Sequence, residues 1–179
     1  MKKALIVIDA QKEYYAGGGY PLWNMDNTIA NIKKAMTAAK EKNVPIILIQ
    51  HVFPKDSGMP IFIEGTPNDQ IAEEILAEAS GAPIVQKADA DSFYHTNLEE
   101  VLSGLGVEEL IITGMMTHNC VVFTSLSKSA EKYQVKLIPE CTTTIDPMVH
   151  NFALAGLSVR VPFVPIEEAF SLENVPCCS

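Results

Sequence analysis

Three polar side chains with complementary chemistry stand at the ends of apolar segments. Asp9 ends the segment ALIVID, Lys87 ends PIVQK, and Cys120 follows ELIITG by a few residues. In an open α/β sheet, ligands bind outside the carboxyl ends of the strands, where such side chains would project into one region. A carboxylate, an ammonium and a thiol together predict a nucleophilic site.

The chemistry and expected positions of these groups also suggest how such a site would work. We expect Cys120 in the first turn of a helix, where the helix dipole and a nearby Lys87 both favour the thiolate. Asp9 could take the thiol proton and later deliver it to a leaving amine. Backbone N–H groups at the helix start could hold an oxyanion. Because Asp9 lies at the edge of the sheet, we expect Asp9→Asn to harm catalysis more than folding.

Simpler interpretations of the three residues remain open at this point. A lone buried cysteine often serves as a small apolar side chain, Asp9 could cap the turn after a strand, and Lys87 could lie on the surface. His118, two residues before Cys120, could form a Cys–His dyad or point to solvent. Cys141, at the end of another apolar segment, is interpreted as structural.

Short apolar segments alternate with helical patterns along the chain, which predicts α/β architecture. The segments are apolar throughout, as in strands buried on both faces, so we expect a three-layer α/β/α fold of the Rossmann-like kind with a six-stranded parallel sheet. Thr96 with Glu99 forms a capping-box pattern, and Asp146 precedes a proline at a helix start. The expected strands are residues 4–9, 44–50, 83–87, 109–114, 135–140 and 161–165, and the expected helices open at residues 26 or 27, 68, 96 and 146.

Composition restricts the classes of partner. The chain has 179 residues, a net charge of −9 and a single arginine, Arg160. Nucleic acid and dianionic substrates are therefore disfavoured, and we expect a small-molecule substrate and no membrane contact. The four cysteines fit neither a zinc motif nor a disulfide framework, which favours the cytoplasm. We expect one domain over residues 1–179, with residues 171–179 as a frayed tail.

Three stretches of the sequence resemble the isochorismatase-like cysteine hydrolases, which include nicotinamidases and N-carbamoylsarcosine and ureidoacrylate-type amidohydrolases. They are ALIVIDAQKEY, IVQKADADSFYHTNLEEVL and LIITGMMTHNCVVFTSLSKSA. The resemblance implies the isochorismatase-like hydrolase fold and a catalytic triad of Asp9, Lys87 and Cys120. It also implies a cis peptide bond between Met115 and Met116, and an oxyanion hole formed by the N–H groups of Met116 and Cys120.

The sequence departs from the metal-dependent relatives. These carry an aspartate and two histidines after the second strand, whereas His51 is the only histidine of this region here. We therefore expect no metal and no cofactor. A homo-oligomer, dimer or tetramer, is also expected. The candidates for the substrate pocket are Tyr14, Trp23, His51, Phe93, Met115 and Asn119.

These features predict a hydrolase that cleaves a C–N bond of a small amide, carbamoyl or ureido compound through an acyl-enzyme on Cys120. Two alternatives stay open. One is a vinyl-ether hydrolase of the isochorismatase type that acts through Asp9 without Cys120. The other is a redox or binding protein without enzymatic activity, in which Cys120 is an oxidisable thiol.

Overall fold

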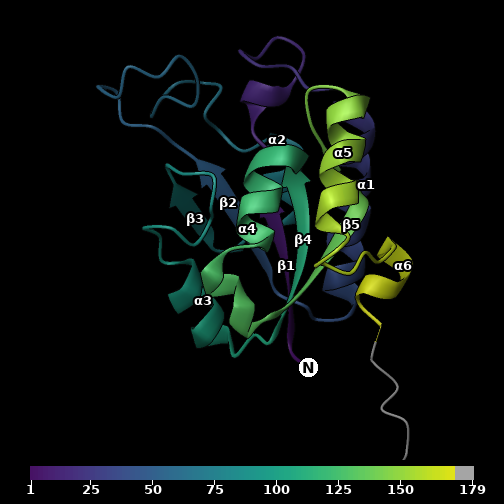
Figure 1. Ribbon diagram of the computed structural model, residues 1–179. Helices are drawn as coiled ribbons and strands as arrows, with labels where there is room; N and C mark the ends of the chain where they lie inside the picture. The colour runs from purple at the N-terminus through teal and green to yellow at the C-terminus, as the bar shows by residue number, and fades with distance from the viewer. Residues whose placement is uncertain (172–179) are drawn as a thin grey trace, which may run out of the picture.

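A computed structural model describes residues 1–171, which form a parallel five-stranded sheet between two layers of helices (Figure 1). The strand order is β3-β2-β1-β4-β5. Apart from Ser171, the expected frayed tail lies outside the described residues. The strands are β1 Lys3–Ile8, β2 Ile46–His51, β3 Ile84–Lys87, β4 Glu109–Met115 and β5 Gln134–Thr143.

Helices cover both faces of the sheet, so the expected three-layer architecture is confirmed. In Figure 1, α4 and α5 lie in front of the sheet and α1 lies behind it. The apolar clusters agree: α1, α2 and α6 pack on one face, and α3, α4 and α5 on the other. The helices are α1 Met25–Glu41, α2 Glu73–Glu78, α3 Leu98–Leu105, α4 Val122–Ser125, α5 Pro147–Leu157 and α6 Ile166–Ala169.

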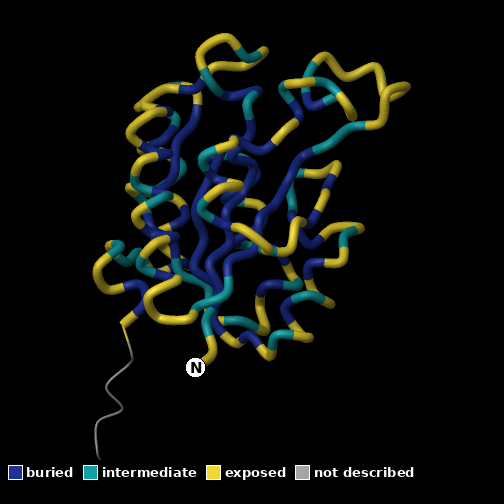
Figure 2. Tube along the Cα trace, turned by 180° about the vertical axis from the view of Figure 1, so that it is seen from behind, coloured by how far each residue is buried: buried dark blue, intermediate teal, exposed yellow. Residues whose placement is uncertain are grey.

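The central strand β1 explains why its sequence is apolar without alternation. Leu5 and Val7 point into one core, while Ala4, Ile6 and Ile8 point into the other. Both faces are closed to solvent, so every position of the strand favours an apolar side chain. Figure 2 shows the buried strands in the middle of the molecule, with exposed loops beyond their ends.

The expected sixth strand is absent from the sheet, and that prediction is wrong. Residues 161–165 meet β5 at one bridge, between Phe163 and Leu137. The Leu137 N–H donates to the Pro162 carbonyl, and the Val164 N–H donates to the Leu137 carbonyl. Extension would need an N–H of residue 162 for the Val135 carbonyl and an N–H of residue 139 for the Val164 carbonyl. Both residues are prolines, so the ladder cannot extend in either direction.

The helix starts were predicted with mixed success. Asp146 caps α5 as expected, because its carboxylate accepts from the N–H groups of Met148 and Val149 at 2.8 and 2.9 Å. The capping box is wrong: the Thr96 hydroxyl accepts from the Leu98 N–H at 3.2 Å, whereas Glu99 pairs with Lys132.

Two other helices differ from the expected starts. Helix α1 begins at Met25, after Asn24 in the left-handed region, rather than at residue 26 or 27. Helix α2 begins at Glu73 instead of residue 68, because Ile71 forms an antiparallel bridge with Gln11.

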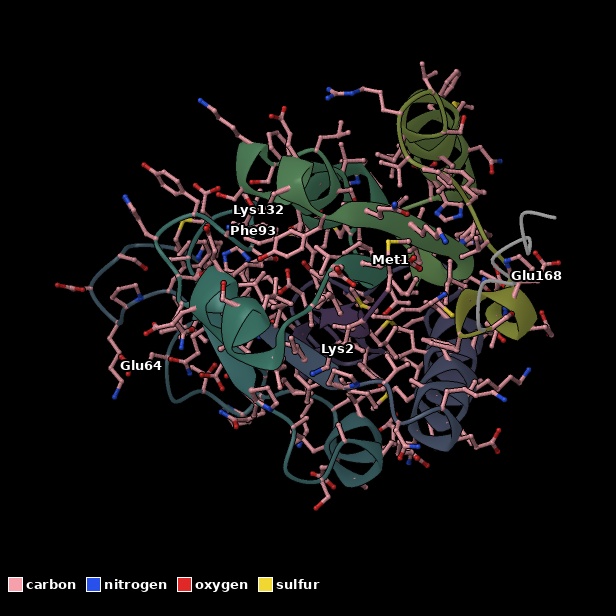
Figure 3. The ribbon with its side chains drawn as sticks, turned by 90° about the horizontal axis from the view of Figure 1, so that it is seen from below. Met1, Lys2, Glu64, Phe93, Lys132 and Glu168 are labelled. Carbon is pink, nitrogen blue, oxygen red and sulfur yellow. The ribbon has the colours of Figure 1, made fainter. Side chains whose placement is uncertain are left out.

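The two ends of the sheet differ in character. Figure 3 views the molecule from the end where β1 begins, with Met1 and Lys2 near the middle of the view. At the opposite end, two irregular segments follow β1 and β2, and the Gln11–Ile71 bridge joins them. The site described next lies at this carboxyl end.

Candidate active site

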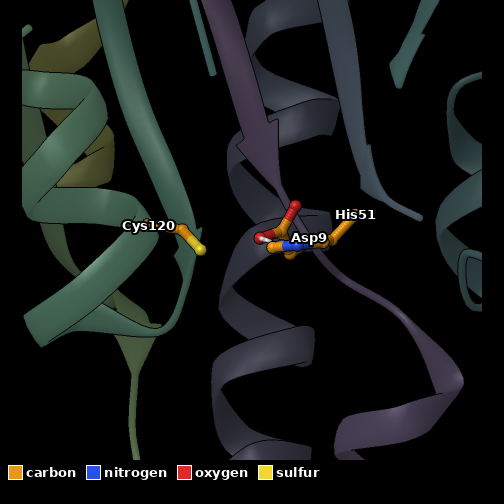
Figure 4. A group of neighbouring side chains, drawn as sticks. All are labelled: Asp9, His51 and Cys120. Atoms are coloured by element: carbon orange, nitrogen blue, oxygen red, sulfur yellow. Dashed lines mark ion pairs between the residues drawn. The ribbon is translucent and has the colours of Figure 1, made fainter. Parts of the chain in front are cut away.

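Four strand ends bring one group of side chains together at the carboxyl edge of the sheet. Asp9 follows β1 directly, His51 ends β2, Lys87 ends β3, and Cys120 lies in the π-helical segment Thr117–Val121 after β4. These strands are neighbours in the sheet, so the side chains converge, as the sequence predicted for Asp9, Lys87 and Cys120. Figure 4 shows Asp9 between His51 and Cys120.

The ammonium of Lys87 is the centre of the group. Its Nζ lies 2.8 Å from Asp9 Oδ2, 3.0 Å from His51 Nδ1 and 3.2 Å from Cys120 Sγ. It also donates to the Asp89 carbonyl at 2.9 Å. The Nδ1 atom can accept a hydrogen bond from this ammonium in the tautomer that carries the ring proton on Nε2.

Burial and charge together set the protonation of the ion pair. Burial alone would raise the pKa of Asp9, but Lys87 and His51 outweigh it and hold this pKa below its usual value. Burial would likewise lower the pKa of Lys87, but Asp9 and Cys120 raise it above its ordinary value. Near neutral pH the pair is therefore a carboxylate and an ammonium.

The thiol of Cys120 is protonated in the free protein. Burial and then the Asp9 carboxylate raise its pKa to about 12, although Lys87 acts in the opposite direction. From the sequence, only the two features that favour the thiolate were visible. The structure corrects that expectation, because Cys120 is only 1% exposed and has a carboxylate as a neighbour.

The turn that carries Cys120 begins with an unusual backbone. The peptide bond between Met115 and Met116 is cis, as the family resemblance implied. The Met116 carbonyl accepts from the N–H groups of Asn119 and Val121 at 3.0 and 3.2 Å. These bonds fix the start of the turn relative to β4 and thereby place the backbone around Cys120.

Two residues that support this geometry were missed in the sequence. The Gln11 side-chain amide donates to the carbonyls of His51 and Asp69 at 2.8 and 2.6 Å, and its oxygen accepts from the His51 N–H at 2.7 Å. Gly114 in β4 has φ 111°, and a Cβ there would lie 2.0 Å from the Ile8 carbonyl oxygen. Its place at the end of an apolar strand was the only available signal for Gly114.

The pocket candidates divide into two groups. Tyr14 is buried beside the centre: burial, and then the charge of Asp9, raise the pKa of its hydroxyl, so it is neutral. Met115 is fully buried at the end of β4, and the His51 ring packs between Phe53 and Phe62.

The other candidates have their contacts elsewhere. Phe93 is buried against Tyr133, 6.1 Å between ring centroids. Trp23 is 39% exposed and packs near His150, and Asn119 is half-buried. His118 bonds to the Thr144 hydroxyl at 2.5 Å, which removes the basis for a Cys–His dyad.

The arrangement is a poor fit to a metal ion. Among the described residues, Asp9, His51 and Cys120 form the single group of metal-ligating side chains, with ligand atoms within 4.8 Å of one another. The Lys87 ammonium already contacts all three. A cation added among these ligands would meet a buried positive charge that it would have to displace.

Fold and site together define a parallel α/β protein with a buried thiol, carboxylate and ammonium at the carboxyl edge of its sheet. Residues 3–166 match the family model of the isochorismatase domain. A secreted isochorismatase effector of Verticillium dahliae is 35% identical over 121 residues, which cover 68% of this chain and 62% of the effector. The chain therefore belongs to the isochorismatase family of hydrolases.

Other relatives share a larger part of their length. Nicotinamidase 3 of Arabidopsis thaliana is 27% identical over 87% of this chain and 80% of its own. The ureidoacrylate amidohydrolase RutB of Agrobacterium fabrum is 28% identical over 150 residues, which cover 66% of this chain and 65% of RutB. A cysteine hydrolase structure from Pseudomonas syringae has a TM-score of 0.85 at 22% identity, covering 94% of this chain and 91% of that one.

The described residues include no helix that is long and apolar enough to cross a membrane. Within the same residues, Cys120 and Cys141 are free thiols. The cytoplasmic location expected from the sequence stays a prediction, and one relative is a secreted effector.

Proposed function

We propose that the protein hydrolyses a C–N bond of a small amide, carbamoyl or ureido compound, with Cys120 as the nucleophile. The observation that carries this proposal is the buried Lys87 ammonium, which lies within 3.2 Å of both the Asp9 carboxylate and the Cys120 sulfur. Two relatives are a nicotinamidase and a ureidoacrylate amidohydrolase, which supports amide chemistry.

The first half of the reaction joins Cys120 to the substrate. Because the thiol is protonated at rest, its proton passes to the Asp9 carboxylate while Sγ attacks the carbonyl carbon. The carbonyl π electrons move to oxygen and form a tetrahedral oxyanion. When that intermediate collapses, the C–N bond breaks, and Asp9 returns the proton to the departing nitrogen.

The oxyanion would accept hydrogen bonds from the backbone N–H groups of Met116 and Cys120. The cis bond lies directly before Met116, and the π-helical turn that carries Cys120 follows it. Backbone donors need no reorganisation during the reaction, and the loss of one such donor typically costs about 10²–10³ in rate.

The second half of the reaction releases the acid. Water attacks the thioester carbonyl while Asp9 accepts a proton from it, and the C–S bond breaks as the proton returns to sulfur. Lys87 keeps its charge throughout: it balances the carboxylate before each transfer and the developing thiolate afterwards.

The charges of the site favour an uncharged substrate. The Lys87 ammonium is already paired with Asp9, and Arg160 borders a separate cavity with Ser125, Tyr133 and Val135. Tyr14 is neutral and lies beside the reacting groups, where its ring could contact a flat substrate. A small neutral amide therefore suits the site better than a carboxylate or phosphate.

Ammonia release from a panel of small amides tests the proposal. We expect turnover of at least one member and its loss in Cys120→Ala, while Cys141→Ala, which removes the other buried thiol, keeps it. Vinyl-ether cleavage that survives Cys120→Ala would favour the Asp9-only reaction. A protein that turns over no panel member but oxidises at Cys120 would favour the redox alternative.

A further inference from the structure

Helix α5 has two apolar stripes, and one of them faces solvent. The inner stripe packs on the sheet. The outer one follows the spacing i, i+4, i+7, i+11 with Met148, Phe152, Ala155 and Val159. Met148 is 67% exposed, Phe152 73% and Val159 82%. A helix that is apolar on both sides is normally covered on both sides. The inner stripe is His150, Leu154, Leu157 and Val161.

The surroundings of the outer stripe are equally unsuited to water. Residues 147–159 contain no charged side chain, although 20% of the whole chain is charged. Beside the stripe, α4 and α5 enclose a groove of about 450 Å³ that includes Val122, Phe152 and Gly156. Phe123 of α4 is a further exposed apolar side chain, with 56% of its surface accessible to solvent. Contiguous apolar surface of this kind marks an interaction site.

We propose that a second copy of this chain covers the stripe, with the two α5 helices antiparallel across a two-fold axis. The stripe is self-complementary in this arrangement. Phe152 and Ala155 are equally far from the midpoint between residues 153 and 154, and so are Met148 and Val159. Each Phe152 ring would therefore pack over the partner's Ala155, and each Met148 against the partner's Val159, as a symmetric interface requires.

The charges that flank the stripe support the same orientation. Asp146 precedes it and Arg160 follows it. Antiparallel helices bring each Asp146 near the partner's Arg160, whereas parallel helices would place like charges together. The chain carries a net charge of −9, so two copies repel each other over most of their surface. An uncharged face bordered by one charge of each sign offers the favourable approach.

The interface would also support the segment that carries Cys120. On the inner side of α5, His150 Nδ1 lies 2.9 Å from the Thr117 hydroxyl, at the start of that segment. A second copy on the outer side would hold α5 in place against it. The dimer itself is independent of the proposed reaction, because none of its contacts involves a reacting group.

Sedimentation velocity at micromolar concentration tests the dimer. We expect twice the chain mass of 19.5 kDa for the wild-type protein. Phe152→Glu should raise the dissociation constant about 30-fold or more, as at the centre of other interfaces. Leu76→Glu, on α2 behind the sheet and 37% exposed, is the matched control and should stay dimeric. Should Phe152→Glu lose its fold by circular dichroism, Met148→Glu reports on the same stripe.

Cysteine cross-linking tests the orientation. In a background with Cys177 and Cys178 replaced by serine, we expect a mixture of Phe152→Cys and Ala155→Cys chains to cross-link faster than either alone. A wild-type protein that is still monomeric at about 100 µM, where even a dimer with a dissociation constant of about 10 µM (about −7 kcal/mol) would form, would overturn the proposal. A dimer that persists in Phe152→Glu would overturn it too. Preferred cross-linking of Val159→Cys to itself would overturn the antiparallel arrangement.

Discussion

Nζ of Lys87 lies 2.8 Å from Oδ2 of Asp9, and neither side chain is exposed to solvent. Asp9→Asn removes one charge and leaves the other buried without a counter-ion. Breaking a buried ion pair in this way typically costs about 3–5 kcal/mol. The sequence-based expectation that the fold would tolerate this change rested on an edge position, and the burial of Asp9 removes that reason.

We therefore predict that Asp9→Asn and Lys87→Met each lower the free energy of unfolding in urea. The double variant, which removes both charges, should lose less than the sum of the single losses. Activity should fall about 10²–10⁴-fold in Asp9→Asn, because Asn cannot accept a proton. Strictly additive losses of unfolding free energy would contradict the energetic coupling of Asp9 and Lys87. Normal turnover by Asp9→Asn would contradict the role of Asp9 in proton transfer.

The ion pair also predicts how stability depends on pH. Since the pKa of Asp9 is lowered by folding, its contribution is complete above the ordinary value of about 3.9 and is lost as pH falls through the lower folded value. The pKa of Lys87 is raised, so its contribution is lost as pH rises through a folded value above about 10.4. The free energies of unfolding in urea of the wild-type protein and the double variant should therefore converge at both the low and the high extreme of pH.

Alkylation of Cys120 should report its protonated state. With a pKa of about 12, the iodoacetamide rate should rise about tenfold per pH unit from pH 7 to 10 without levelling off. Asp9→Asn should speed the reaction at a given pH, because Asp9 raises the Cys120 pKa. Lys87→Met should slow it, because Lys87 lowers that pKa. Peptide mapping separates Cys120 from the other cysteines, and a plateau below pH 8 would mean a resting thiolate.

His51 supports the ammonium through one ring nitrogen. Asparagine can place its oxygen near the position of Nδ1, so His51→Asn should keep the acceptor for Lys87 and lose less than about 10-fold in kcat. His51→Phe keeps the ring packing with Phe53 and Phe62 but lacks any acceptor, and should lose more. Equal rates in the two variants would show that the acceptor does not matter.

Gly114 permits the close approach of β4 to β1. Gly114→Ala places a methyl group 2.0 Å from the Ile8 carbonyl oxygen at φ 111°, so we expect a loss of about 3 kcal/mol or more and of activity. Gly104→Ala in α3 is the matched control, because nothing lies within 4 Å of its added carbon, and should gain about 0.5–1 kcal/mol. Thermal and urea unfolding measure both, and a harmless Gly114→Ala would contradict the contact.

Turnover should be independent of metal. The Lys87 ammonium lies among Asp9, His51 and Cys120, which within residues 1–171 are the group of side chains that could bind an ion. Dialysis against EDTA should leave the rate unchanged, and elemental analysis should find less than one zinc per chain. A stoichiometric metal whose removal stops turnover and whose return restores it would disprove this prediction.

The sequence alone determined the layered α/β fold and the place of Asp9, Lys87 and Cys120. Both followed from local signals: uninterrupted apolar segments predict strands buried on both faces, and parallel strands end at one edge. The cap of α5 by Asp146 was equally local, since one side chain and two N–H groups of the next turn form it.

Only the tertiary structure decided the features that depend on distant segments. The apolar residues around Pro162 favour a strand beside β5, but Pro162 has no N–H with which to continue the hydrogen bonds. Gln11 joins two loops that are far apart in sequence. The protonation of Cys120 is the clearest case. A helix start and a lysine favour the thiolate, but burial and the Asp9 carboxylate oppose them. The balance depends on how four strand ends pack together, because solvation and charge act through space and not along the chain.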